Sequence, residues 1–398
     1  MLENYQSFGG IHPETAAVKN VLAYHGVKAP HTGEPFSEAM LFGICGGVGM
    51  CYILWEFKRE GRTEPILVLA FCNKSNYPVK RLTNLCNRLN AKLTVKETSG
   101  KKLAEKHLAE ALDRGQPAIA VVSESHLPYL YNSSDDELCY GKHLTIIDLN
   151  ETRAIVDDLG EKPFSISREA LTLARNVVPS YKNRLFLIEP PQSFDLEPAI
   201  RAGIQDCVDY LSAKSDSFSL PAIKKWARMM TDGKNKKSWP NVFQNPGDLY
   251  SNLLGVYLGI KYYGTDGAAL RELYADFLDE SDSVISNSIL SEAAVAYRES
   301  AALWQNFAEL AFPDKYFSQT KKIFAEKDEI YKEQGDVGVQ SMLELDKKLS
   351  ALAKKFRSNF PMNQGEINGL VENMASSLER ILEAEQTALA TLKSCLQG

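Results

Sequence analysis

The sequence lacks the features that usually identify a chemical class directly. Its seven cysteines are scattered over 398 residues without a C-x-x-C pair, so we expect neither a disulfide framework nor a cysteine zinc site, and a reducing, cytoplasmic compartment is predicted. No H-x-x-x-H spacing or Cys/His cluster indicates a metal site, and no metal or other cofactor is expected. The glycine-rich segment GICGGVG at 43–49 has neither the lysine nor the preceding strand of a phosphate-binding loop, so no such loop is predicted.

Positive charge and long apolar runs are also scarce. The formal net charge is -6 at pH 7, which argues against a nucleic-acid partner because such proteins need a basic face. The strongest apolar runs, such as AIAVV at 118–122, are far too short to span a bilayer, so no membrane partner is expected. The first residues show no basic segment followed by an apolar run, and we therefore predict no signal peptide.

The hydrophobic pattern predicts two domains and an α+β fold class. Apolar residues make up 44% and charged residues 24%, which is typical of a soluble globular protein. Strands alternate with helices as far as about residue 190, whereas helical periodicity dominates from residue 195 onward. The prediction is an α/β domain at 1–190 and an all-helical domain at 195–398. Strands are expected within 50–57, 65–71, 93–98, 116–122, 144–149, 153–157 and 184–188.

We expect any reactive centre to be built on residues 9–57. His12 and Pro13 open a predicted helix that Gly26 ends, with Glu14 in the first turn where it complements the helix dipole. Ser37 is predicted to cap a short helical turn. The glycine cluster that follows allows the tight or left-handed backbone needed before the next strand.

A second candidate set lies on the predicted hairpin of 144–157. His143 begins one strand and Asp157 ends its return strand, so an imidazole base and a carboxylate that orients it could meet across the sheet, as acyl transfer requires. The plainer alternative is that His143 only flanks a strand and that Asp148 and Asp157 are turn residues.

Three blocks of sequence, taken together, carry a family resemblance. They are LFGICGGVG at 41–49, LPY at 127–129 and GTDGAALRELYADFL at 264–278, followed by ALW at 302–304. In this order they resemble the butirosin biosynthesis acyltransferase family, in which a helical domain follows the N-terminal domain. The resemblance implies a papain-like or C39-peptidase-like N-terminal fold. It also implies transfer of an acyl group from a carrier-protein thioester to a small-molecule amine acceptor in specialised metabolism.

Two departures from the family pattern leave the mechanism open. Pro13 stands where many relatives have a cysteine, and Ser123 stands where relatives often have an aspartate. In one interpretation His143 or His12 deprotonates the amine directly while the N–H groups of Gly46 and Gly47 hold the oxyanion. In another, Cys45 acts as nucleophile, either in the transferase or in a cysteine hydrolase or amidase. In the third, the fold binds a ligand or partner without catalysis, and Cys45 is a small buried side chain.

Further residues of the matched blocks are candidates for substrate binding. Glu38, Tyr129 and Arg175 fall in this group, although Arg175 equally suits an ion pair. The basic segment 224–237 could dock an acidic acyl carrier protein, or it is simply a solvated loop between helices. The last predicted helix, 364–396, either closes a bundle or pairs with a second copy, so oligomer formation is left open.

Overall fold

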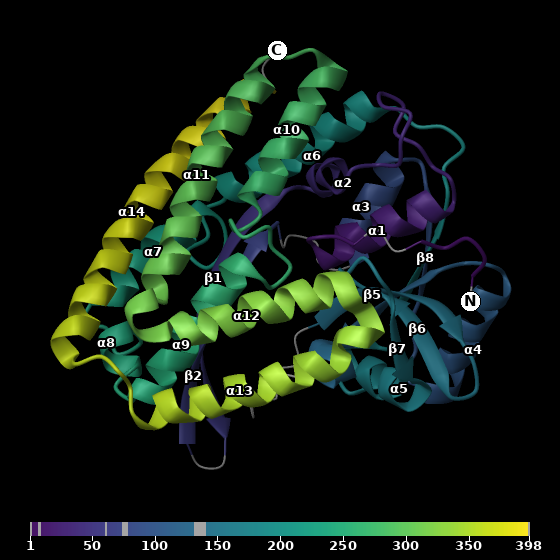
Figure 1. Ribbon diagram of the computed structural model, residues 1–398. Coiled ribbons are helices and arrows are strands. Elements are labelled where there is room, and N and C mark those ends of the chain that lie inside the picture. Colours follow the sequence, from purple (N-terminus) through teal and green to yellow (C-terminus); the bar gives the residue numbers. More distant parts are fainter. Residues whose placement is uncertain (1, 7–8, 60–61, 74–78, 131–140, 397–398) are drawn as a thin grey trace. The chain divides into compact units, whose positions relative to one another are not determined.

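The chain folds into two compact units, each assembled from three separate segments. The computed structural model describes residues 1–398 apart from 1, 7–8, 60–61, 74–78, 131–140 and 397–398, so Cys139 lies outside the described residues (Figure 1). The sheet unit comprises Met1–Leu41, Pro78–Asp195 and Lys322–Ser350. The helical unit comprises Phe42–Tyr77, Leu196–Lys321 and Ala351–Gly398. The change from strands to helices near residue 195 therefore coincides with one boundary between the units. In addition, residues 42–77 belong to the helical unit and residues 322–350 belong to the sheet unit.

The sheet unit is built on a six-stranded antiparallel sheet in the order β3-β8-β4-β5-β6-β7. Its strands are β3 (Lys92–Lys96), β4 (Ala118–Ser123), β5 (Gly141–Leu149), β6 (Arg153–Asp157), β7 (Phe164–Ser167) and β8 (Leu185–Glu189). Every residue of β4 is buried, because its near-continuous apolar run packs on both faces of the sheet centre. The β5–β6 hairpin agrees with the prediction, whereas the short β7 was not anticipated.

In the sheet unit, residues that are visible in the sequence determine where some of the helices begin and end. They are α1 (Pro13–Tyr24), α3 (Val79–Arg88), α4 (Lys101–Asp113) and α5 (Arg168–Asn176), with 3-10 turns at Glu124–His126, Pro128–Leu130, Pro179–Tyr181 and Gly335–Gly338. Pro13 occupies the first turn of α1, where its missing N–H costs nothing. Gly26 follows that helix with φ of 71°, a left-handed conformation that glycine adopts without strain. Ser167 caps α5 by accepting a hydrogen bond from the Ala170 N–H.

The helical unit combines a β-hairpin with a bundle. Strands β1 (Val48–Arg59) and β2 (Arg62–Cys72) form a two-stranded antiparallel sheet of their own. The helices are α6 (Leu196–Ser212), α7 (Leu220–Thr231), α8 (Trp239–Val242), α9 (Pro246–Lys261), α10 (Arg271–Ile285), α11 (Ile289–Ala311) and α14 (Gln364–Ser394). The long helices α11 and α14 run side by side (Figure 1). Apolar side chains repeated along α14, including Met374, Leu378 and Ile381, are buried, as its amphipathic pattern predicts.

Three helices pass from one unit to the other. They are α2 (Glu38–Ile44), α12 (Asp314–Gln334) and α13 (Val339–Ser358). Within the sheet unit, the Glu161 N–H donates to the Lys332 carbonyl at the end of α12 at 2.7 Å, and the Ser165 N–H donates to Asp336 Oδ1 in the 3-10 turn that follows, at 2.6 Å. Helical periodicity alone could not show that these residues belong to the sheet unit.

The fold class is therefore a mixed α/β arrangement with a sheet-containing first part and a largely helical second part. The strand expected at 65–71 is part of β2, but it pairs with β1 outside the main sheet, and its residues Ile66 to Ala70 are half-buried where the continuous apolar run predicts a buried strand. In the part of the chain that the structure describes, none of the helices combines the length and apolar character needed to cross a bilayer.

Candidate functional site

The N-terminal end of α1 is held in place by Glu38. Its carboxylate accepts hydrogen bonds from the backbone N–H of His12 at 2.7 Å and of Ile11 at 2.9 Å, and from the Thr15 hydroxyl at 3.1 Å. A carboxylate at this end of a helix is also favoured by the helix dipole. Glu38 therefore positions the start of the helix, and its predicted contact with a substrate stays a prediction.

Behind this cap, three charged or ionisable side chains meet in a buried cluster. Glu14 in the first turn of α1 forms an ion pair with Arg81 of α3, with Oε2 and Nη1 2.8 Å apart. The other Glu14 oxygen lies 3.9 Å from His143 Nε2 on β5. Each of the three side chains is 2–3% exposed. Because a buried carboxylate needs a compensating charge, Arg81 explains how Glu14 can stand beside the histidine. We call Glu14, Arg81 and His143 the α1 cluster.

Asp157 lies on the strand next to His143. The register pairs Thr145 of β5 with Asp157 of β6, and side chains two residues apart on a strand share a face, so His143, Thr145 and Asp157 line the same face of the sheet. Asp157 Oδ2 accepts hydrogen bonds from the Tyr5 hydroxyl at 2.5 Å and from Asn20 Nδ2 at 2.8 Å. The structure thus brings the predicted base and carboxylate onto one face, with α1 packed on β5.

His12 lies at the cap position of α1 and its side chain is buried. The Thr15 hydroxyl lies 3.4 Å from His12 Nδ1. His12 belongs to the same unit as His143, and its backbone N–H is engaged by Glu38. A catalytic role for His12 stays a prediction.

Tyr129 belongs to a second buried polar group of the sheet unit. Its hydroxyl donates to Asp158 Oδ2 at 3.1 Å, and Lys142 Nζ lies 3.0 Å from the same carboxylate oxygen. Lys142 also donates to the Tyr331 hydroxyl at 3.0 Å, while the rings of Tyr129 and Phe164 stack with centroids 4.0 Å apart. Burial is the main cause that raises the pKa of Tyr129 well above its usual value, and the negative charge of Asp158 raises it further. These contacts lock Tyr129 into the core, which favours a packing role.

Arg175 is buried as well. Its guanidinium donates to the backbone carbonyl of Asn183 at 3.1 Å and to that of Ala104 at 3.5 Å. Burial lowers the pKa of Arg175 to about 10, with the nearby carboxylate of Glu105 acting in the opposite direction. The side chain therefore joins α5 to its neighbours, and the predicted clamp on a substrate carboxylate or phosphate has no support in these contacts.

Cys45, Gly46 and Gly47 belong to the helical unit, not to the unit that contains His143. Cys45 is 3% exposed. The Gly46 N–H donates to the Gly43 carbonyl at 2.9 Å and the Gly47 N–H donates to the Phe42 carbonyl at 3.0 Å. Both amides are thus engaged in the turn that ends α2. Their predicted role as oxyanion donors remains untested, and the described hydrogen bonds favour a structural role.

The glycine cluster has a packing cause within the helical unit. A Cβ atom at Gly47 would lie 2.3 Å from the Tyr274 ring, and one at Gly43 would lie 2.1 Å from the Phe277 ring. Both aromatic residues belong to α10, in the YADFL segment. Two of the three blocks that carry the family resemblance therefore pack directly on each other, and glycine is required because the rings approach the backbone closely.

We expect Gly47→Ala to destabilise the helical unit by about 2–4 kcal/mol, since it combines a left-handed backbone with overpacking. Gly47 has φ of 61°. Gly255→Ala is the matched control, because Gly255 lies inside α9 with nothing within 4 Å of a new Cβ and should gain up to about 1 kcal/mol. Urea denaturation followed by tryptophan fluorescence measures both, and equal stability of the two variants would contradict the packing argument.

Two residues of the α1 cluster, Glu14 and Arg81, are not among the site residues predicted from the sequence. Glu14 was interpreted only as a first-turn acid, although its place directly after His12 and Pro13 in the predicted reactive stretch was a usable signal. Arg81 is separated from Glu14 by 67 positions, so no local pattern could pair them. Among the residues described, no group of three His, Cys, Asp or Glu side chains could hold a metal ion.

Two family models match consecutive parts of the chain. The model described as Butirosin biosynthesis protein H, N-terminal, matches residues 12–159, and the model described as Domain of unknown function (DUF4872) matches residues 169–322. The first match starts at His12 and includes the α1 cluster and Asp157. No curated protein matches the chain significantly.

Proposed function

We propose that this chain, whose residues 12–159 match the family model of Butirosin biosynthesis protein H, N-terminal, and whose residues 169–322 match the domain of unknown function DUF4872, is an N-acyltransferase. The proposed reaction moves an acyl group from a thioester, with an acyl carrier protein as donor, to a small-molecule amine. The sheet unit supports a papain-like assignment, since a helix begins beside a histidine-bearing antiparallel strand and the next strand carries a carboxylate.

The observation that carries this proposal is the α1 cluster beside Asp157. In the proposed step, the amine nitrogen attacks the thioester carbonyl and its proton passes to His143. The C–S bond then breaks, and the thiolate leaves with that proton while the new amide forms. Glu14, 3.9 Å from His143 Nε2, stabilises the imidazolium that exists between the two transfers. The donor is already activated as a thioester, so this route needs no thiol at Pro13.

A second candidate function is supported by the burial of the same residues. His143 and Arg81 are each 2% exposed, and Arg81 neutralises Glu14 through a short ion pair. Such a cluster also suits a non-catalytic domain that binds a ligand or partner, because buried charges that are paired stabilise a fold without any chemistry. Cysteine hydrolase activity is the third possibility, and it depends on Cys45.

One experiment separates these functions. Thiol release from a panel of acyl N-acetylcysteamine thioesters is measured with and without added amines, and amide products and protein mass are followed by mass spectrometry. Direct transfer predicts amine-dependent release that survives in Cys45→Ala and falls about 10²–10⁴-fold in His143→Gln. A mass gain that disappears in Cys45→Ala would instead establish an acyl-cysteine. Absence of turnover over the whole panel, in protein with an unchanged melting curve, would favour the binding function.

A further inference from the structure

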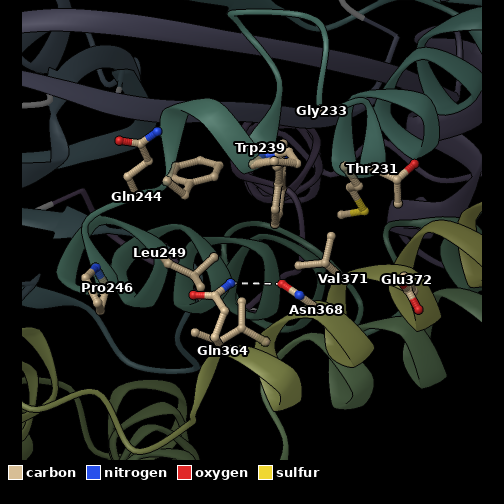
Figure 2. A pocket seen from close by; sticks show the side chains of 14 residues that line it. Thr231, Gly233, Trp239, Gln244, Pro246, Leu249, Gln364, Asn368, Val371 and Glu372 are labelled. Carbon is tan, nitrogen blue, oxygen red and sulfur yellow. Dashed lines mark hydrogen bonds between the residues drawn. The ribbon is translucent and has the colours of Figure 1, made fainter.

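The helical unit contains a pocket of about 540 Å³ that the proposed chemistry does not use (Figure 2). Its walls come from the end of α7, the loop after it, the short α8, the start of α9 and the first turns of α14. The volume falls within the range of small-molecule sites, roughly 300–1,000 Å³. All of these elements belong to one compact unit, so the pocket is a feature of that unit by itself.

The floor of the pocket is apolar and fixed in orientation. Trp239 is 2% exposed, and its indole N–H donates to the Tyr52 hydroxyl at 3.2 Å. Phe243 packs edge-on against Trp239, with ring centroids 5.0 Å apart. Leu249 of α9 is buried beside the same cavity. Because these side chains are already held by neighbours, a ligand that covers them would lose little free energy to reorganisation.

The rim is polar and exposed. Helix α14 contributes Gln364, Asn368 and Glu372, which are four residues apart and therefore share one face of the helix. Gln364 Nε2 donates to Asn368 Oδ1 at 2.9 Å, shown by the dashed line in Figure 2. Gln244, from the segment before α9, adds a third amide at the rim. An apolar floor with a few polar groups around it is typical of a site for a small organic molecule.

Charge at the pocket favours a cation. Glu372 is the sole charged side chain among the pocket-lining residues that the structure describes, and the lysines of the loop 232–238 do not line the cavity. The N-terminal end of α14 is a poor site for an anion, because the capping box of Asn363 and Glu366 engages the Glu366 N–H and places a carboxylate at that end. Aromatic faces together with a carboxylate attract an organic ammonium group.

We infer that this pocket binds a small protonated amine with an aromatic or alkyl body. The apolar body covers Trp239 and Phe243, the ammonium group is attracted by Glu372, and the amides of the rim bind polar substituents. This inference goes beyond the proposed transfer reaction and does not depend on it.

The test compares isosteres that differ in charge. Tryptamine, tryptophol and indole-3-propionate are titrated into the full-length protein by calorimetry, and phenethylamine and hexylamine are each compared with their alcohol and carboxylate counterparts. The amine of each set is expected to bind at least about fivefold more tightly than its neutral and anionic counterparts. Equal affinities within all three sets, tighter carboxylate binding, or no detectable binding would each overturn the inference.

Variants locate the site. Glu372→Gln should remove the preference for the amine, whereas Glu379→Gln, an exposed acid on α14 that does not line the pocket, should leave it unchanged. Val371→Trp fills the cavity and should abolish binding of all the probes, with a melting curve to verify folding. An amine preference that persists in Glu372→Gln or in Val371→Trp would place the binding elsewhere and refute the assignment. The binding result stands independently of thioester turnover, so failure of one proposal is distinguishable from failure of the other.

Discussion

Replacing Glu385 with alanine is expected to destabilise the helical unit by about 3–5 kcal/mol, because it leaves a buried arginine without its counter-ion. Arg271 and Glu385 are both fully buried, with Nε and Oε1 2.7 Å apart. The same carboxylate oxygen accepts hydrogen bonds from Ser300 at 2.7 Å and from the Trp304 indole at 2.9 Å. One substitution therefore removes the acceptor of three donors from α10 and α11.

Arg271 also connects the hairpin to the bundle. Its guanidinium donates to the carbonyl of Gly49 in β1 at 3.0 Å and to that of Phe71 in β2 at 3.1 Å. When Glu385 is absent, the uncompensated charge favours states in which the hairpin separates and water reaches the guanidinium. The double variant Arg271→Met/Glu385→Leu should therefore be more stable than Glu385→Ala alone, since apolar side chains often replace a buried pair with little loss.

The measurement is selective because all four tryptophans, at positions 55, 226, 239 and 304, belong to the helical unit. Urea denaturation followed by tryptophan fluorescence thus reports on that unit, and Glu379→Ala, on the exposed face of α14, serves as the control with an expected change within about 0.5 kcal/mol. If Glu385→Ala lowers the free energy of unfolding by less than about 1 kcal/mol, the pair of Arg271 and Glu385 does not have the expected importance for the stability of the helical unit.

The same pair makes a pH prediction. Burial alone would raise the pKa of Glu385, but the charge of Arg271 and the hydrogen bonds from Arg271, Trp304 and Ser300 together lower it. Its contribution is therefore complete above the unfolded-state pKa of about 4.3 and is lost as the pH falls through the lower folded-state value. The stability difference between the wild type and the double variant should change only on this acidic side, which denaturation at several pH values would show.

Local sequence patterns predict where many helices and strands form, but they do not predict to which compact unit each one belongs. The amphipathic run from Leu220 to Thr231, with Pro221 in the first turn, coincides with α7, because such a pattern defines a helix locally. The hairpin that carries Asp157 was also predicted, since its strands are adjacent in sequence. The strand character of 65–71 was equally visible, but a strand pattern does not reveal its partner, and β2 pairs outside the main sheet.

The same limit applies to the candidate site. His143 and Asp157 lie a few residues from one turn, so the sequence could place them together. Cys45 belongs to the other unit, and its role as a nucleophile stays a prediction. Arg81 comes from a helix that sequence could predict, yet its pairing with Glu14 is a tertiary contact that only the packing of α1 and α3 in the sheet unit creates.

Removal of Glu14 is the corresponding prediction for the sheet unit. Glu14→Ala leaves Arg81 buried without the carboxylate 2.8 Å from its Nη1 and should cost about 3–5 kcal/mol. Glu14→Gln keeps the shape and a hydrogen-bond acceptor, so its loss should be smaller. Since this unit holds no tryptophan, hydrogen exchange monitored by mass spectrometry is the suitable measurement, with faster exchange expected in the peptides of α1 and β5. Glu110→Ala, which removes a surface carboxylate of α4, should leave these peptides unchanged.

A double variant at Glu14 and Arg81 separates the effect on stability from the effect on the reaction. If the carboxylate only neutralises Arg81, then Glu14→Gln/Arg81→Met, which removes both charges, should restore slow exchange and leave amine-dependent thioester turnover close to that of the wild type. If Glu14 stabilises the protonated His143 during transfer, as we propose from the 3.9 Å separation, the double variant should regain stability while its turnover stays at least about tenfold low. Full turnover in a stable double variant would exclude Glu14 from the reaction and leave it a structural partner of Arg81.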